Sequence, residues 1–421
     1  MKKKNLLRAT VVATTLLSGA AWATDGYFPH GYGMKALGMG GASVAMTDNA
    51  FAGANNPATA AFAGNRYEMG VNLFMPDRGA SRTGAGGMNG DADSGSKSFL
   101  VPEFGYTRQV SSDMALGLTV YGNGGMNTDY PATGINCGAG PANMLCGSTK
   151  LGVNLMQLIV APTFAYKLSE VSAVGVSPLL VYQQFRASGL QAFAGNPSWT
   201  GQSAYSTNTT DNGNDSSTGL GVRVGYTTAL SDQLRLGASY SPKTNMSKFK
   251  KYAQLFAEGG DFDIPENYAF GLAAQVTPNV TLALDYQRIN YSKVKAVGNS
   301  MMQGGPLGAS NGPGFGWADV NVIKLGLEWK YDPKWTLRGG YNHTNNPVNA
   351  SNVTFNIIAP GVIKDHYTAG ATYALDNKSE LTVAYMYAPR NTVTGTSALS
   401  STPETIRMSQ QSLGIQYGWK F

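Results

Sequence analysis

The sequence predicts an all-β protein, a 14-stranded antiparallel transmembrane β-barrel with an N-terminal plug in its lumen. Three observations predict this fold: an export leader, a series of segments in which polar and apolar residues alternate, and connections that alternate between short and long. The composition agrees, because 53 of the 421 residues are glycine and only 13% are charged. No apolar run of about 18 residues follows the leader, as a membrane-spanning helix would require.

Residues 1–23 have the three regions of a cleavable secretory signal peptide. These regions are a basic start, a short apolar core and a small-x-small cleavage site: Lys2, Lys3, Lys4 and Arg8, then Leu6 to Leu17, then Ala21-Trp22-Ala23. The alternative is an amphipathic N-terminal helix of a cytosolic protein. The whole chain has a formal net charge of +6, but the leader carries four basic and no acidic residues, so the remainder is about +2. This near neutrality excludes a nucleic-acid partner.

Beyond residue 66, apolar residues recur at every second position, which is the pattern of a β-strand. The last segment is the clearest, with Leu413, Ile415, Tyr417, Trp419 and Phe421 separated by glycine or polar residues. Fourteen such segments begin near residues 67, 98, 114, 152, 173, 218, 233, 267, 280, 320, 335, 366, 380 and 408.

The connections between these segments decide between a soluble sandwich and a membrane barrel. After every second segment the connection is tight, as at Ser231-Asp232 and Thr277-Pro278-Asn279. The other connections run from about 18 to 30 residues and are rich in Gly, Asn, Ser and Thr. Short turns at one end and long loops at the other, with an even strand number, are typical of bacterial outer-membrane barrels. A soluble sandwich has no reason to sort its loops in this way.

Lipid contact then assigns the two faces of each strand. The Leu, Val and Tyr series must face lipid, so the intervening series, including Arg223, Lys324 and Arg338, is expected to face the lumen and form ion pairs there. The terminal Phe421 is expected to present the last strand to the barrel-assembly machinery. The protein is expected to be a monomer in contact with outer-membrane lipid and lipopolysaccharide.

Residues 24–66 precede the first strand and are too apolar and too numerous for a disordered tail. They are rich in Gly and Ala and contain Asn56, Pro57 and Ala58. The lumen is the place where such a segment can be buried. The sequence therefore predicts a signal peptide over 1–23, a plug over 24–66 and a barrel over 67–421.

A second unusual region is Ser247 to Glu258, in a predicted external loop. Phe249, Tyr252, Ala253 and Phe256 follow helical spacing, and Lys248, Lys250 and Lys251 surround them, which predicts an amphipathic helix. Two interpretations stay open: a helix that lies on the barrel rim, or an apolar lip at the mouth of the pore. The second makes this region the candidate substrate site, with the residues Lys248, Phe249, Lys251, Tyr252, Leu255 and Phe256.

The two cysteines, Cys137 and Cys146, are nine positions apart in a stretch rich in Gly, Pro and Asn. In an exported protein this spacing predicts a disulfide, which would stabilise the order of its loop by roughly 2–3 kcal/mol. A metal site would need more ligands nearby, and no nucleophile motif accompanies His343 or His366. We therefore expect no metal, no cofactor and no enzymatic activity.

Two stretches resemble a known family. Gly31 to Ala58 (GYGMKALGMGGASVAMTDNAFAGANNPA) is similar to the start of FadL/TodX-type outer-membrane transporters of long-chain fatty acids and aromatic hydrocarbons. Lys248 to Tyr268 is similar to the fourth external loop of that family. The Asn-Pro-Ala element at Asn56, Pro57 and Ala58 is the most specific part, and the resemblance covers the chain after the leader.

The resemblance implies a transport route. A hydrophobic substrate would lodge in a groove between residues 187–217 and 243–265, then displace the N-terminal hatch. It would leave sideways through a gap in the third strand, which is predicted to end in Tyr121-Gly122-Asn123-Gly124-Gly125. Gly122, Gly124 and Gly125 would allow the backbone to leave the ladder. The Cys137–Cys146 loop has no counterpart in this pattern.

Two other functions remain possible from the sequence. A general diffusion porin for polar solutes would use a loop with opposed charge clusters, and it would not need a plug. A structural or adhesive barrel is supported only by the long Ser-, Thr- and Asn-rich loops. Among hydrophobic substrates, the sequence does not rank fatty acids, alkanes and monoaromatics.

Overall fold

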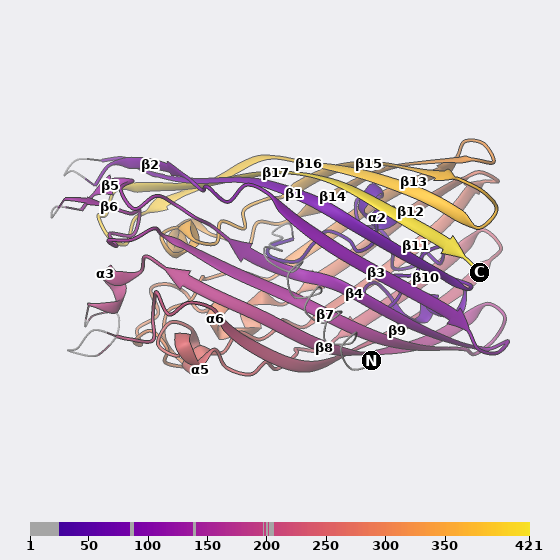
Figure 1. Cartoon of the computed structure of the whole chain (residues 1–421), viewed down its shortest axis with the longest axis horizontal. Helices are drawn as coiled ribbons and strands as arrows, with labels where there is room; N and C mark the ends of the chain where they lie inside the picture. The colour runs from indigo at the N-terminus through magenta and orange to yellow at the C-terminus, as the bar shows by residue number, and fades with distance from the viewer. Residues whose placement is uncertain (1–24, 85–87, 138–139, 197, 199–200, 202–205) are drawn as a thin grey trace, which may run out of the picture.

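Fourteen long strands form one antiparallel sheet that closes on itself into a barrel (Figure 1). The structure is a computed structural model that describes residues 25–84, 88–137, 140–196, 198, 201 and 206–421. The predicted signal peptide lies outside the described residues. Each strand pairs with the next along the chain, and β17 pairs with β1 from Arg66↔Lys420 to Arg82↔Glu404, which closes the ring.

The barrel strands are β1 (Arg66–Arg82), β3 (Phe99–Gln109), β4 (Met114–Asn127), β7 (Gly152–Lys167), β8 (Ser172–Ser188), β9 (Asp215–Ser231), β10 (Leu234–Ser241), β11 (Asn267–Thr277), β12 (Val280–Ile289), β13 (Val320–Lys330), β14 (Trp335–Thr344), β15 (Asp365–Ala374), β16 (Ser379–Thr396) and β17 (Pro403–Lys420). The shorter elements are α2 (Met34–Gly38), η1 (Pro57–Ala61), β2 (Gly90–Asp93), β5 (Ile135–Asn136), β6 (Pro141–Ala142), α3 (Gln191–Ala194), η2 (Lys250–Tyr252), α5 (Ala257–Gly260), η3 (Tyr291–Lys293), α6 (Lys295–Gly298), η4 (Ala350–Asn352) and η5 (Phe355–Ile357). In Figure 1, β2, β5, β6 and α3 lie at the end of the barrel away from the C-terminus.

Twelve of the fourteen predicted strand starts fall within one residue of the observed ones. The exceptions are β9 and β17, which begin three and five residues earlier than predicted. Both early starts are polar, as in the stretch from Pro403 to Arg407. This end of β17 pairs with β16 up to Thr396↔Pro403, beyond the lipid-facing part of the strand. Polar and apolar residues alternate only where one face of a strand contacts lipid. The pattern therefore does not mark this part of the hairpin, and the strand start was predicted too late.

The alternation of faces is as predicted. On β13, Ile323, Leu325 and Leu327 are 41–46% exposed on the outside, while Lys324 and Glu328, in the alternate positions, are buried on the inside. Aromatic side chains gather on the outer face at the end with the short turns, for example Trp335 and Tyr373 with ring centroids 4.8 Å apart. Such aromatic pairs are typical of the boundary between hydrocarbon and water. Among the described residues, no helix is long and apolar enough to cross a bilayer.

Residues 25–65, here called the N-terminal segment, lie inside the barrel. Helix α2 packs against β14, β15, β16 and β17, and η1 packs against β3, β4, β7, β8 and β9 on the other side. Glycines on the inner faces of the strands allow this close approach. A Cβ at Gly225 would lie 2.0 Å from the Asn56 Oδ1 atom, and one at Gly340 would lie 2.1 Å from the backbone of Met39 and Gly40. Part of the high glycine content is therefore explained by packing against this segment.

Buried ion pairs join neighbouring strands on the inner face of the barrel. Glu328 and Arg338 are direct cross-strand partners of β13 and β14, and the Arg338 Nη2 atom lies 2.7 Å from Glu328 Oε2. Arg338 also donates from Nη1 to the Thr372 hydroxyl at 2.6 Å. The pair is buried, with both side chains at most 7% exposed.

We therefore expect Arg338→Met to destabilise the barrel by about 3–5 kcal/mol, because it leaves the Glu328 carboxylate buried without a cation. The double variant Arg338→Met with Glu328→Gln should recover most of this loss. Chemical unfolding in lipid vesicles measures it. The matched control is Arg390→Met, which removes an exposed partner of Asp77 and should cost less than about 1 kcal/mol. Equal losses in the two single variants would contradict this account.

Candidate functional site

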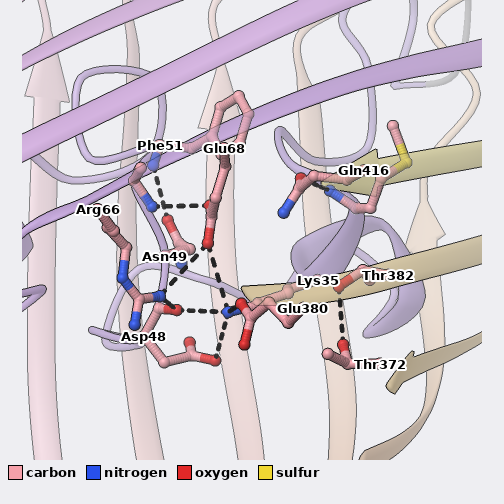
Figure 2. A network of polar contacts seen from close by, with 12 residues as sticks. Lys35, Asp48, Asn49, Phe51, Arg66, Glu68, Thr372, Glu380, Thr382 and Gln416 are labelled. Carbon is pink, nitrogen blue, oxygen red and sulfur yellow. Dashed lines mark hydrogen bonds and ion pairs between the residues drawn. The ribbon is translucent and has the colours of Figure 1, made fainter. Parts of the chain in front are cut away.

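A buried lysine connects the N-terminal segment to the barrel wall (Figure 2). The Lys35 Nζ atom of α2 lies 2.7 Å from Glu380 Oε1 of β16 and 3.4 Å from Glu68 Oε1 of β1. It also donates to the carbonyl of Asp48 at 2.7 Å, and Arg66 of β1 donates to the same carbonyl. Sequence reasoning missed Lys35. The sequence did contain an indication, because Lys35 is the sole Lys or Arg within residues 24–65.

The Asn-Pro-Ala element connects the other part of the segment to β9. The Asn56 side chain accepts from the Ala58 N–H at 3.1 Å and donates from Nδ2 to the carbonyls of Val44, at 2.8 Å, and Tyr226, at 3.0 Å. Pro57 begins η1, where its missing N–H costs nothing. One amide thus caps a 3-10 turn, folds the segment back on itself and joins it to a strand.

The predicted lumen cations do not form one site. Arg223 of β9 donates to the carbonyls of Gly53 and Ala54 in the N-terminal segment. Arg223 and Lys324 line a common cavity of about 30 Å³, together with Asp285 and parts of the segment. Arg338 is instead paired with Glu328, so it belongs to the wall network described above. All three face the lumen, and two of them contact one cavity.

An aromatic cluster lies at the end of the barrel with the long loops. Phe185 of β8 is surrounded by Phe256, Tyr252 and Phe249 of the loop between β10 and β11, with centroid distances of 4.6, 4.9 and 5.6 Å. These four side chains are buried. Tyr252 also donates from its hydroxyl to the carbonyl of Gly213 at 2.6 Å.

The predicted helix over Ser247 to Glu258 is wrong. The loop forms only the short 3-10 turn η2 and the one-turn element α5, and inside α5 Glu258 and Gly259 have φ values of 60° and 75°. The helical spacing was real, but the aromatic side chains reach Phe185 from an irregular backbone. Glycine at 259 and 260 gives little support to a helix, so tertiary packing decides the conformation.

Two small cavities of about 30 Å³ each lie beside this cluster, and every side chain that lines them is apolar. The Phe185 cavity is lined by Phe185, Phe256 and Phe315 among others, and the Leu145 cavity by Leu145, Leu190 and Phe193. The two cavities share four residues from three different loops: Leu255, Leu307, Phe355 and Ile358.

Of the six predicted substrate residues, only Leu255 and Phe256 are among the residues that line these cavities. Phe249 and Tyr252 support them from behind. Sequence reasoning missed Leu307, Phe355 and Ile358, which come from loops other than the two it named. Their signal is an apolar cluster inside a loop, as in the stretch from Phe355 to Val362.

The predicted lysines are engaged outside the cavities. Lys248 donates from Nζ to the carbonyl of Glu258 at 2.5 Å, and Lys251 donates from Nζ to the carbonyl of Asn214 at 2.8 Å. In the same loop, burial raises the pKa of Asp261 to about 6, and the neighbouring Asp263 carboxylate adds to this rise. The contact of either lysine with a substrate head group stays a prediction.

The third barrel strand, β4, stops pairing with β3 partway along its length. Its ladder with β3 ends at Phe104↔Val120, whereas its ladder with β7 continues to Asn127↔Asn154. The register with β7 shifts between Gly122 and Gly124, so Asn123 is a bulge residue. The glycines thus lie within the strand, which continues to Asn127 and does not end at Gly125 as predicted.

The N-terminal segment occupies the place next to this break. The Gly125 N–H donates to the carbonyl of Tyr27 at 3.3 Å. Gly124 has a φ of 150°, and a Cβ there would lie 2.1 Å from the Tyr27 carbonyl oxygen. The buried Asn123 side chain accepts from the Tyr32 hydroxyl and donates to Gln157, both at 3.1 Å. Part of the β4 edge is therefore paired by the segment in place of a strand.

Cys137 and Cys146 are joined by a disulfide, with their Cα atoms 5.7 Å apart. Both are partly buried against the hydrophobic core that contains the aromatic cluster. Among the described residues there is no group of three or more His, Cys, Asp or Glu side chains that could hold a metal ion.

Comparison with known proteins identifies the family. The curated long-chain fatty acid transport protein of Escherichia coli K12 is 24% identical over 430 residues, which cover 92% of this chain and 93% of that protein. The fold is that of the Pseudomonas putida toluene transporter TodX, with a TM-score of 0.68, 22% identity, and coverage of 93% of this chain and 99% of that one. A Pseudomonas aeruginosa FadL homologue has a TM-score of 0.70 at 15% identity, and 94% of this chain and 99% of that one are covered.

A model of one family matches residues 10–420, nearly the entire chain. The chain belongs to the outer membrane protein transport protein family (OMPP1/FadL/TodX).

Proposed function

We propose that this protein carries hydrophobic compounds across the outer membrane. The substrate is captured at the Phe185 and Leu145 cavities, passes the N-terminal segment, which acts as a hatch, and leaves sideways at the break between β3 and β4. The observation that carries this proposal is the pair of cavities, which are lined by apolar side chains although they lie among external loops.

A hydrophobic core that only held the loops together would not need internal spaces. Apolar side chains that surround small, partly empty spaces forgo dispersion contacts, and a hydrophobic ligand that entered would supply those contacts and leave water. The family relatives named above are a fatty acid transport protein and a toluene transporter. Long-chain fatty acids and toluene share apolar surface rather than a head group, which fits a site without polar side chains.

The hatch role is supported by the type of contact that holds the N-terminal segment. Many of its ties to the wall are polar, among them those of Lys35, Asn56 and the carbonyl groups that Arg223 contacts. The segment also packs on the strands through small apolar clusters that contain Met34, Met39 and Ala58. Polar contacts can be exchanged for water when a segment moves. A diffusion porin, the rival function, would have no use for a segment that fills the lumen.

Lateral exit is supported by the energetics of both solute and backbone. A hydrophobic solute gains about 25 cal/mol per Å² of apolar surface by entering lipid rather than the aqueous periplasm. Unpaired strand edges are costly in hydrocarbon. The break in β4 is accompanied by a substitute partner, the Tyr27 carbonyl on the hatch, so movement of the hatch would open the route and expose the edge together.

The mechanism consists of binding and displacement, so it includes no chemical step. We also infer that the chain acts as a monomer in contact with outer-membrane lipid and lipopolysaccharide, and that its terminal strand is recognised during barrel assembly. The Phe421 ring at its end stacks on Tyr106 of β3, with centroids 6.0 Å apart.

Deletion of residues 24–58 should leave a folded barrel with a sharply higher single-channel conductance in planar bilayers. Lys35→Met should give intermediate conductance with frequent openings, because Glu68 and Glu380 lose their shared cation on the segment. Lys420→Met is the control, since it removes the exposed second cation near Glu380 at 3.7 Å and leaves the segment untouched. Porin-like conductance in the intact protein would refute the hatch.

Replacement of Leu255 and Leu307 by serine should weaken ligand binding about tenfold or more, since each apolar side chain buried against ligand contributes about 1.5–3 kcal/mol. Equilibrium dialysis with radiolabelled toluene and, separately, oleate would measure the loss. Met302→Ser is the matched control, because Met302 belongs to the same loop as Leu307 and is 68% exposed. Unchanged affinity for both ligands in the double variant would show that the capture site does not lie in these loops.

Deletion of Asn123 should remove the bulge and restore a regular ladder between β4 and β7. Because this would close the proposed exit, uptake of hydrophobic substrate in cells should fall at least about tenfold. Binding to purified protein should survive because the cavities lie elsewhere. Asn123→Ala is the control: it keeps the bulge while removing the contacts with Tyr32 and Gln157. Normal uptake by a correctly assembled deletion variant would show that the substrate does not leave at β4.

A further inference from the structure

Residues 143–147 form a turn that the disulfide joins to Cys137, here called the disulfide-closed turn. This turn contributes one wall of the Leu145 cavity. Leu145 immediately precedes Cys146 and is 1% exposed. The other residues that line the cavity are Leu190, Phe193, Leu255, Leu307, Phe355 and Ile358. A turn that merely covered the surface would not place a large apolar side chain inward at the meeting point of four other loops.

Asn143 holds this turn in a single shape. Its Oδ1 atom accepts from the N–H groups of Leu145, at 2.8 Å, and Gly147, at 3.0 Å. Its Nδ2 group donates to the carbonyl of Gly189 at 2.8 Å. Gly189 precedes Leu190, so one buried amide sets the position of Leu145 relative to the facing wall of the cavity.

A buried ion pair supports the turn from the barrel side. Arg82 of β1 is paired with Glu404 of β17, and both side chains are fully buried. Arg82 donates from Nη2 to the carbonyl of Met144 at 2.9 Å, and Glu404 accepts from the Thr354 hydroxyl at 2.5 Å. Thr354 precedes Phe355, so the ion pair joins the Leu145 wall to the Phe355 wall.

Cys146, at the end of the turn, has a backbone conformation that residues other than glycine rarely adopt. Cys146 has a φ of 61°, in the left-handed region, and its N–H donates to the carbonyl of Asn143 at 2.9 Å. Its partner Cys137 follows β5, which pairs with both β2 and β6. The disulfide thus fastens the turn to a small sheet outside the barrel ring.

We propose that the disulfide-closed turn is the size-determining wall of the capture site: Leu145 limits the ligand that the cavity accepts, and the Cys137–Cys146 bond is the positioning element that holds Leu145 there. This inference rests on the proposed capture of hydrophobic compounds. It also specifies the ligand chemistry at this wall, a neutral hydrocarbon group, because no polar or charged side chain lines the cavity.

The test compares toluene with butylbenzene, which differ in the length of one neutral chain, in competition for tritiated toluene on the full chain in outer-membrane vesicles. Leu145→Ala should shift the affinity ratio at least fivefold toward butylbenzene, because it enlarges the cavity. The double variant Cys137→Ser with Cys146→Ser should shift the ratio in the same direction. Dithiothreitol should produce that shift in the wild-type protein and leave the double variant unchanged.

Leu399→Ala is the matched control, since Leu399 packs against the same hydrophobic core but does not line either cavity. Its affinity ratio should equal that of the wild type, and gel migration without heating should show that every variant forms the barrel. An unchanged ratio in Leu145→Ala, while the wild type binds toluene, would overturn the inference and leave the proposed function standing. If the wild type binds neither compound, the proposed function fails and this inference fails with it.

Discussion

Backbone N–H and C=O groups that face hydrocarbon must be paired, and the rest of this structure depends on that constraint. It requires the sheet to close, which the ladder between β1 and β17 does over their whole length. It also makes any break in the sheet informative. The ladder between β3 and β4 ends at Phe104↔Val120, and the carbonyl of Tyr27 partly replaces the missing strand.

Closure with this many strands creates the second requirement, a filled lumen. A barrel of 14 strands encloses more space than its own side chains occupy. The N-terminal segment fills that space, and strand glycines such as Gly225 and Gly340 let its backbone approach the wall. The Lys35 contacts with Glu68 and Glu380, shown in Figure 2, are buried where an unpaired charge would be costly, so they help to fix the segment on the wall.

The external loops form the apolar cavities and hold them in shape. They carry an aromatic cluster and two apolar cavities within one hydrophobic core, and polar contacts fix the turns at its edge. Asn143, the Arg82–Glu404 pair and the disulfide all act on one turn. Rigid contacts are therefore concentrated around Leu145, at the place where several loops meet.

The sequence by itself determined the barrel. Alternation of polar and apolar residues reports which side of a strand meets lipid, and the parity of loop lengths reports which end of the barrel a connection occupies, so strand number and inside-outside orientation were readable. The starts of β9 and β17 were misplaced, because the outward-facing residues there are polar, so polar and apolar residues do not alternate. Cys137, Cys146 and Asn56 were also recognisable, since the meaning of each depends on neighbours in the chain.

Only the tertiary structure decided the site. Phe249, Tyr252 and Phe256 follow a helical spacing, yet they meet Phe185 from an irregular backbone, and only Leu255 and Phe256 of the predicted set line a cavity. Leu145, Leu307 and Phe355 are far apart in the sequence and become neighbours because the strands that carry their loops are arranged in a ring. A cavity is formed by residues that share no local pattern, so its membership follows from the closure of the barrel and from the packing of its loops.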